Sequence, residues 1–166
     1  QLAALLRRSL DSSGEQEVSL RSELEFLNDY VEIIKVRFKG RITVTTDVEQ
    51  QAMDATVPNL ILQPIVENAV RHGLEPRAAG GHVAVTAWVH GDALNLEIED
   101  DGVGVETIKR HNASTGSGVG LQNTSDRLRH LYGDSARITV SARSGGGTTV
   151  SVVIPYKDRL SLAVGT

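Results

Sequence analysis

Clusters of glycine are the part of this sequence whose residue types are best suited to bind a ligand. Glycine supplies 16 of the 166 residues, and half of them gather at 102–104, 116–120 and 145–147. Glycine lets the backbone approach a bound group closely. A glycine-rich loop that opens into a helix also presents free N–H groups to a phosphate. Residues 116–121 are therefore a candidate phosphate-binding loop, although a lone GxGxG more often marks a plain flexible loop before a capped helix.

A polar group on one predicted helix supports the ligand interpretation. Its members are Glu67, Asn68, Arg71 and His72. Asn68, Arg71 and His72 are separated by three and four positions, which places them on one face of an otherwise apolar helix. Such a face can be a solvated edge or can cap nearby loops, and for His72 alone that interpretation is favoured. For the whole group, beside three glycine clusters, a ligand is favoured.

The composition excludes several other classes of protein. The absence of cysteine excludes disulfide scaffolds, thiolate metal sites and cysteine nucleophiles. The 17 Lys and Arg against 21 Asp and Glu give a net charge of −4 without a long basic run, so we expect no nucleic-acid partner. The signatures of a P-loop, a dinucleotide-binding βαβ unit, a compact zinc motif and a GxSxG hydrolase are missing. No apolar run reaches the roughly 18 residues of a membrane span.

The elements that must position these residues follow from the spacing of apolar side chains. Spacings of three and four predict helices, and the third of them is expected to begin at Pro58 and to stop at Gly73. Alternating β-branched runs predict strands, two of which meet at the hairpin signal Gly91-Asp92. The predicted helices cover 2–10, 19–38, 58–72 and 119–132. The predicted strands cover 41–47, 52–57, 82–90, 93–99, 136–141 and 148–154.

The order of these elements indicates the fold class. Paired antiparallel strands with helices between them favour a two-layer α+β sandwich over a doubly wound parallel sheet. The polar, glycine-rich segment 105–118 has no period and is predicted to be a flexible loop.

Four motifs in one order make the chain resemble a known family. An asparagine helix at 63–73 (QPIVENAVRHG) is followed by DxGxG at 100–104, GxGxG at 116–120 and GxGT at 145–148. This order resembles the Bergerat ATP-binding fold shared by sensor histidine kinases, the gyrase and Hsp90 ATPases and the MutL proteins. The asparagine motif is most similar to that of LytS-type sensor histidine kinases, Gln-Pro-x-Val-Glu-Asn-Ala-x-x-His-Gly. The resemblance covers roughly residues 2–156.

The resemblance implies an architecture and a division of the chain. It implies a mixed, mostly antiparallel sheet covered by helices on one face, preceded by a helical segment. Residues 1–38 would be the C-terminal part of a dimerisation and phosphoacceptor region, 39–156 the ATP-binding catalytic domain and 157–166 a tail.

The resemblance also implies ATP and Mg²⁺ as ligands and assigns roles to residues. Asn68 would coordinate Mg²⁺ through its side-chain oxygen, the kind of ligand that this ion prefers, and Glu67 would polarise the attacking group or a metal-bound water. Arg71 would pair with phosphate charge, supported by His72, which completes the catalytic set. Asp100 would accept a hydrogen bond from the adenine amino group. The other implied nucleotide-binding residues are Gly102, Gly104, Gly116, Gly118, Val119, Gly120, Leu121, Gln122 and Thr148.

The implied function is that of the catalytic domain of a two-component sensor histidine kinase. Such a domain transfers the γ-phosphoryl group of ATP to a histidine that lies outside this fragment. None of the five histidines has the His-Phe-x-Phe-Asn context of the phosphoacceptor, so we expect ATP binding without self-phosphorylation. Pro64 stands where the gyrase-like ATPases carry a catalytic glutamate, which argues against a self-contained ATPase of that class.

The resemblance implies partners and leaves two alternatives open. The partners would be a phosphoacceptor histidine domain, of the same parent chain or of its dimer partner, and a response regulator. The parent would be a membrane-anchored homodimer with this domain in the cytoplasm. The alternatives are a serine protein kinase of the anti-sigma-factor type and an ATP-sensing pseudo-kinase module that transfers nothing.

Overall fold

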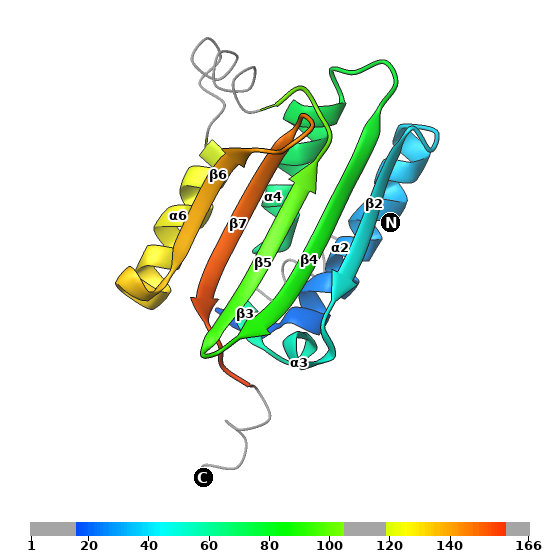
Figure 1. The fold of residues 1–166 in the computed structure, drawn as a ribbon. Coiled ribbons are helices and arrows are strands. Elements are labelled where there is room, and N and C mark those ends of the chain that lie inside the picture. The colour runs from blue at the N-terminus through cyan, green and yellow to red at the C-terminus, as the bar shows by residue number, and fades with distance from the viewer. Residues whose placement is uncertain (1–15, 105–118, 159–166) are drawn as a thin grey trace.

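The protein is built on a five-stranded mixed sheet (Figure 1). The computed structural model describes residues 16–104 and 119–158, so the predictions for 2–10 and 105–118 lie outside the described residues. The strand order is β2-β4-β5-β7-β6, in which only the β2–β4 pair is parallel. The strands are β2 (Ile42–Val48), β4 (Gly81–His90), β5 (Ala93–Asp100), β6 (Arg137–Ala142) and β7 (Thr148–Pro155).

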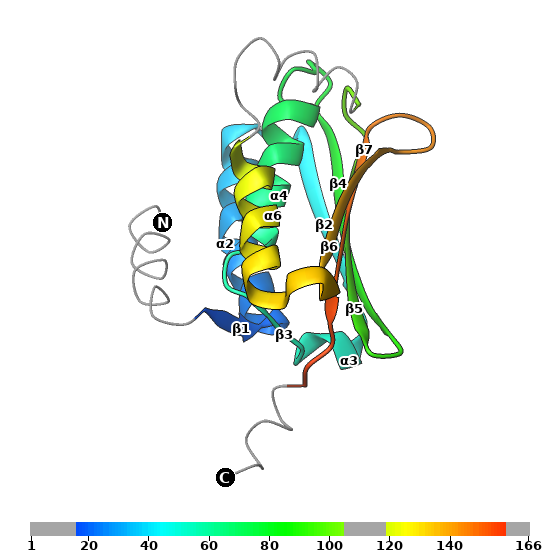
Figure 2. The same ribbon diagram turned by 90° about the vertical axis from the view of Figure 1, so that its left-hand side faces the viewer.

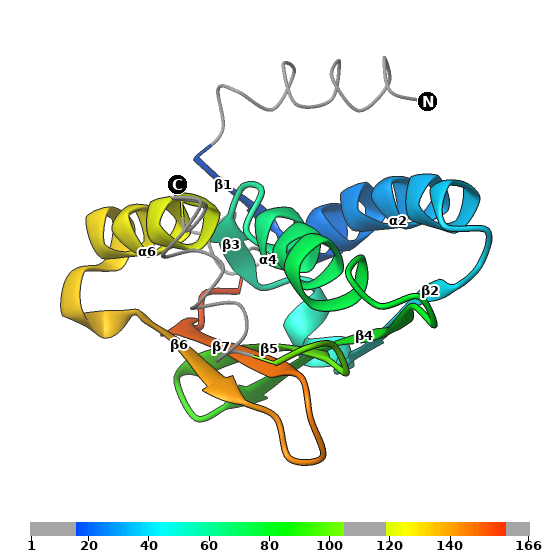
Figure 3. The ribbon, with the colours of Figure 1, turned by 90° about the horizontal axis from the view of Figure 1, so that it is seen from above.

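Helices cover one face of this sheet (Figures 2 and 3). The helical layer consists of α2 (Leu20–Arg37), α4 (Leu62–Asn68) and α6 (Val119–Tyr132). The predicted two-layer α+β sandwich, with a mixed and mostly antiparallel sheet, is thus confirmed. Smaller elements are β1 (Glu17–Ser19), α3 (Gln50–Met53), β3 (Thr56–Pro58) and the 3₁₀ turn η3 (Gly133–Ser135).

An aliphatic core fills the space between the two layers. Strand residues of alternate positions, such as Val83, Val85, Leu96 and Ile98, are buried against the helices. The opposite face of the sheet is partly solvated and polar, as alternation in an antiparallel sheet predicts. No helix within the described ranges combines the length and the apolar character needed to cross a membrane.

The predicted helix over 19–38 is confirmed as α2. The Ser19 side chain caps its start by accepting a hydrogen bond from the Ser22 N–H at 3.2 Å. The buried face carries apolar residues at helical spacing, including Leu24 and Leu27. Gly40 follows its end with φ +74°, a conformation that glycine adopts without strain.

The predicted bounds of the third helix are wrong at both ends. Pro58 ends β3, which pairs with β1, and the helix begins only at Leu62. Pairing with a distant strand is a long-range contact that local spacing does not report. At the other end, Gly73 does not stop the helix, because α4 continues as the π-helix η2 (Ala69–Leu74). The strand predicted over 52–57 is confirmed only in part, because residues 52 and 53 belong to α3 and β3 begins at Thr56.

Candidate functional site

Asp100 is the centre of the candidate site. It is the last residue of β5 and is 3% exposed, and its Oδ1 accepts a hydrogen bond from the Gly102 N–H at 2.8 Å. Burial raises the pKa of Asp100, while the backbone N–H groups of Gly102 and Thr148 oppose that rise. The site therefore holds a carboxylate in a place that is costly for a charge.

Thr148, the first residue of β7, is the direct neighbour of Asp100 on the adjacent strand. The two residues are partners in the β5–β7 register, and Thr148 is 4% exposed. Its hydroxyl makes no well-aligned hydrogen bond among the described residues, although it lies close enough to the Asp100 carboxylate to lower the pKa of that group. Buried hydroxyls are almost always fully paired, so a poorly paired hydroxyl beside a buried carboxylate is consistent with a polar ligand at this site.

Three glycines pack around Asp100 without room for side chains. A Cβ at Gly73 would lie 2.7 Å from Asp100 Oδ1, and one at Gly102 would overlap the Gly73 carbonyl. A Cβ at Gly147 would overlap the Asp100 carbonyl, and Gly147 also has φ +100°. Gly104 lies farther out, where a Cβ would be 3.6 Å from the Gly147 carbonyl oxygen. These contacts bring the ends of β5, β7 and η2 together as bare backbone.

The π-helix η2 joins the polar helix to this end of the sheet. The Glu75 N–H donates to the Val70 carbonyl at 2.8 Å, the i to i−5 bond of a π turn. The Gly73 carbonyl then accepts from the Val103 N–H at 3.0 Å. Because η2 is continuous with α4, the residues at the end of α4 are connected rigidly to the surroundings of Asp100.

The predicted polar group lies along this widened helix. Glu67 and Asn68 are half-buried at the end of α4, and Glu67 accepts a 2.6 Å hydrogen bond from the Gln63 side chain. His72 is half-buried and Arg71 is exposed. The one face predicted from α-helical spacing does not hold past Asn68, because a π turn places residues three and four apart at different angles.

The first turn of α6 lies at the same end of the helical layer as η2 (Figure 2). Gly116 and Gly118 lie outside the described residues, and Val119 and Gly120 form the start of the helix backbone. Leu121 packs against the core, and Gln122 is exposed and donates to Asp126 at 3.0 Å. The first N–H groups of a helix have no partner within it, so this turn offers donors to a ligand.

Two features of the site were not predicted. Gly73 was expected only as a helix stop, although it packs on Asp100. Val140, in register with Val150 on the helix-facing side of the sheet, is 43% exposed. The strict alternation of strand 136–141 was the signal that could have placed Val140 on that side.

Asp101 points away from the site, in contrast to its neighbour. Its Oδ1 accepts from the His82 N–H at 2.8 Å, and Arg77 lies 3.5 Å from the same oxygen. Arg77 also donates to the Asp101 carbonyl. Asp101 thus fastens the start of β4.

Comparisons with known proteins place the chain in a family. Residues 53–158 match the family described as "Histidine kinase-, DNA gyrase B-, and HSP90-like ATPase", and residues 1–42 match one described as "Histidine kinase". The sensor protein LytS of Staphylococcus epidermidis is 30% identical over 165 residues, covering 95% of this chain and 28% of LytS. The sensor histidine kinase BtsS of Escherichia coli is 33% identical over 157 residues, covering 95% of this chain and 27% of BtsS. The chain thus spans less than a third of these relatives.

Solved structures share the fold at lower identity. A histidine kinase domain from the blue-light activated histidine kinase of Erythrobacter litoralis has a TM-score of 0.62 at 22% identity, over 97% of this chain and 74% of that one. The mycobacterial sensor histidine kinase MprB has a TM-score of 0.59 at 19% identity, over 86% of this chain and 97% of that one.

Proposed function

Because the chain belongs to the histidine kinase-, DNA gyrase B- and HSP90-like ATPase family, we propose that it is the catalytic ATP-binding domain of a sensor histidine kinase. Residues 39–156 are the main part of this domain, 1–38 are the end of the dimerisation and phosphoacceptor region, whose α2 packs on the same core, and 157–166 are a tail. The parent is a membrane-anchored homodimer that passes the phosphoryl group on to a response regulator. The single observation that carries the proposal is the buried Asp100 carboxylate, enclosed by glycine backbone and flanked by the buried Thr148 hydroxyl, which makes no well-aligned hydrogen bond.

The residues around Asp100 fit an adenine base. Asp100 accepts a hydrogen bond from the exocyclic amino group, and the Thr148 hydroxyl bonds the ring, directly or through a water. Gly102, Gly104 and Gly147 let backbone segments meet closely beside Asp100, so the base would contact bare backbone here rather than side chains. Val140 and the other aliphatic residues supply an apolar wall, so recognition needs no aromatic stacking.

The phosphates fit the polar end of α4 and the start of α6. Asn68 offers the oxygen ligand that Mg²⁺ prefers, and the exposed Arg71 guanidinium pairs with phosphate charge. The free N–H groups of Val119, Gly120 and Leu121 donate to phosphate oxygens, with Gln122 and the glycines at 116 and 118 beside them. His72 supports this arrangement.

Phosphoryl transfer requires mainly positioning and charge stabilisation from the protein. Bound ATP with Mg²⁺ supplies the phosphoryl group and neutralises part of its charge. Asn68 and Arg71 hold the γ-phosphate in line with an imidazole nitrogen of the acceptor histidine, and Glu67 orients that acceptor. The bond from the γ-phosphorus to the bridging oxygen breaks, the bond to nitrogen forms, and ADP leaves.

Calorimetry with ATP and ADP, with and without Mg²⁺, tests nucleotide binding by this chain. Binding at millimolar concentration or below, with loss in Asp100→Ala and Asn68→Asp, is expected. Absence of binding by the unaltered chain would overturn the proposal.

Incubation with a separately produced histidine-bearing domain and labelled ATP tests transfer. Acid-labile phosphate on that domain is the expected product. Acid-stable phosphate would indicate a serine kinase instead, and binding without any transfer would indicate an ATP-sensing module.

A further inference from the structure

A buried glutamate of α2 is bonded to the start of the helix that ends in Asn68. Glu23 is 2% exposed, and its carboxylate accepts three backbone N–H groups, from Leu60 at 2.6 Å, Ile61 at 2.8 Å and Leu62 at 3.2 Å. The first helical N–H groups of α4 would otherwise lack partners, because no local side chain caps this helix. Glu23 thus serves as a cap supplied from a different helix.

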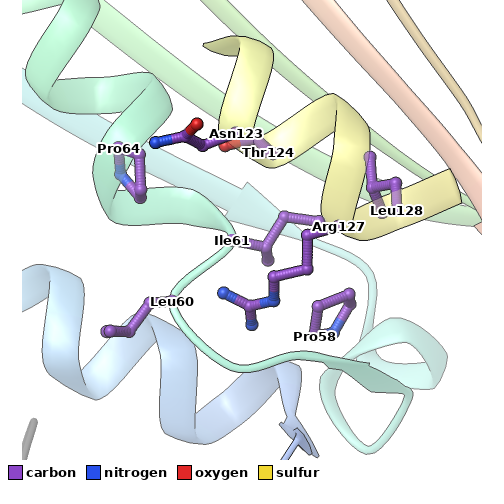
Figure 4. A pocket seen from close by; sticks show the side chains of 8 residues that line it. All are labelled: Pro58, Leu60, Ile61, Pro64, Asn123, Thr124, Arg127 and Leu128. Carbon is purple, nitrogen blue, oxygen red and sulfur yellow. The ribbon is translucent and has the colours of Figure 1, made fainter. Parts of the chain in front are cut away.

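An arginine of α6 holds the same loop from the other side. The Arg127 guanidinium donates to the Asn59 carbonyl. It reaches that carbonyl across a cleft of about 250 Å³ between α6 and the start of α4 (Figure 4). Arg127 also favours the charged form of Glu23 electrostatically. Residues 59–61, which we name the α4 lead-in loop, are therefore hydrogen-bonded to side chains of both α2 and α6.

The backbone of the α4 lead-in loop is strained and depends on these hydrogen bonds. Leu60 has φ +58°, a left-handed conformation that costs energy for a residue other than glycine. A strained residue persists only where its surroundings hold it in place. The Leu60 N–H is bonded to Glu23 and the neighbouring Asn59 carbonyl to Arg127, and the Asn59 N–H donates to the Gln16 carbonyl at 3.1 Å.

The position of this loop determines the position of Asn68. Asn68 is the seventh residue of α4, less than two turns from its start, so a shift or rotation at Leu62 reaches Asn68 before it reaches the far end of η2, which is fixed where Gly73 meets Val103 and Asp100. We propose that Glu23 and Arg127 are positioning residues that hold the α4 lead-in loop and thereby aim Asn68 at the metal-bound phosphates. This inference rests on the proposed function, because it concerns the same nucleotide site.

Nucleotide binding then has two parts, recognition of the base and a contribution that depends on Mg²⁺. Recognition of the base depends on Asp100 and Thr148, which belong to the sheet and do not contact the loop. The contribution of Mg²⁺ depends on Asn68 at the end of α4. Disturbing the loop should therefore weaken the Mg²⁺-dependent part of ATP affinity and leave the metal-free affinity for adenosine or ADP nearly unchanged.

Calorimetry of this chain with Glu23→Gln, titrated with ATP plus Mg²⁺ and with metal-free ADP, tests the separation. The amide keeps the size of the side chain but turns an NH₂ group toward backbone donors. We expect affinity for ATP with Mg²⁺ to fall about tenfold or more, because small misplacements of a ligating group are costly, while metal-free ADP affinity changes less than about twofold. Glu25→Gln is the matched control, since Glu25 lies exposed on the same helix.

Arg127→Met provides a second variant if Glu23→Gln does not fold, with the exposed Arg129→Met as its control. The same selective loss with Mg²⁺ is expected. Equal losses with and without Mg²⁺, or no loss in either variant, would overturn the positioning role while leaving the proposed function intact. If the unaltered chain bound no nucleotide, the proposed function would fail and this inference with it.

Discussion

Asp100 and Glu23 are both carboxylates that are almost fully buried, and burial raises the pKa of both. Glu23 accepts three backbone N–H groups, with a cation nearby, so its hydrogen-bonding capacity is used within the fold. Asp100 instead lies beside a hydroxyl without a well-aligned hydrogen bond, and its neighbours are glycines that offer close backbone approach. Burial alone therefore does not distinguish a ligand site from a structural carboxylate. Bare backbone and spare hydrogen-bonding capacity around the same carboxylate favour a ligand.

The largest expected effect concerns the glycines on the Asp100 side of the comparison. Gly147→Ala would drive a Cβ into the Asp100 carbonyl, and we expect it to lower the free energy of unfolding by about 3–5 kcal/mol. Gly146→Ala is the matched control, because Gly146 also has positive φ but nothing within 4 Å of its Cβ position. It should cost only the conformational strain, about 1–2 kcal/mol. Urea denaturation measures both, and equal losses would contradict the close packing.

The next largest effects on binding and stability are expected when each of the two carboxylates is replaced by an amide. With its oxygen held by the Gly102 N–H, Asp100→Asn would present an NH₂ group to the adenine amino group. We expect nucleotide affinity to fall about 10- to 100-fold, equivalent to 1.4–2.8 kcal/mol, with unfolding free energy changed by less than about 1 kcal/mol. Glu23→Gln should instead lower the unfolding free energy by about 1–3 kcal/mol, because buried donors lose their acceptor. Calorimetry measures the nucleotide affinity and urea denaturation the free energy of unfolding. If both variants lost affinity and stability to the same extent, the two carboxylates would not have different roles.

A smaller effect isolates the Thr148 hydroxyl. Thr148→Val removes a buried hydroxyl without a well-aligned hydrogen bond at nearly constant shape, so we expect the free energy of unfolding to change by less than about 1 kcal/mol. Nucleotide affinity should fall by roughly three- to tenfold because a ligand bond is lost.

Thr56→Val is its control, since the Thr56 hydroxyl is the other buried side-chain atom without a well-aligned hydrogen bond in the described part of the chain. Thr56→Val should change the free energy of unfolding as little as Thr148→Val does and should leave nucleotide affinity unchanged. Unchanged affinity in Thr148→Val would show that the Thr148 hydroxyl does not belong to the site.

The smallest effect is on pH dependence. The pKa of Asp100 is raised above 3.8 and that of Glu23 above 4.5, so the folded chain binds these protons more tightly than the unfolded chain. Their contribution to stability is therefore fully present below the unfolded pKa and is lost as pH rises through the folded pKa.

Nucleotide should distinguish the two groups in that pH window. A donor on Asp100 favours its charged form, so nucleotide affinity should fall as pH decreases through the Asp100 pKa. Asp100→Asn should abolish that dependence and Glu23→Gln should leave it unchanged. Calorimetry across the window measures this, and an identical pH dependence in Asp100→Asn would assign it to another group.

Most of the fold was predictable because its signals are local. The hairpin at Gly91-Asp92, the bounds of α6 and the start of α2 follow from turn residues and periodicity within one segment. The start of α4 was not, because β3 pairs with β1 far away along the chain. Within the candidate site, Asp100 and Thr148 stand in strand patterns that end together in the sheet. Glu23 could not be distinguished by sequence from the other charges on an amphipathic helix, since its role depends on a loop 37 residues away.

The pairing of β5 with β7 has a consequence for the order of folding. The β4–β5 and β6–β7 hairpins join strands that are neighbours in the chain and can form quickly, whereas Asp100 meets Thr148 only when the whole stretch 101–147 has closed. No other pair of neighbouring strands in the five-stranded sheet spans so long a stretch. A nucleotide bound as proposed, between Asp100 and Thr148, would therefore lie across the contact in this sheet that costs the most entropy to close. Such a ligand stabilises the closed sheet by mass action and slows its opening.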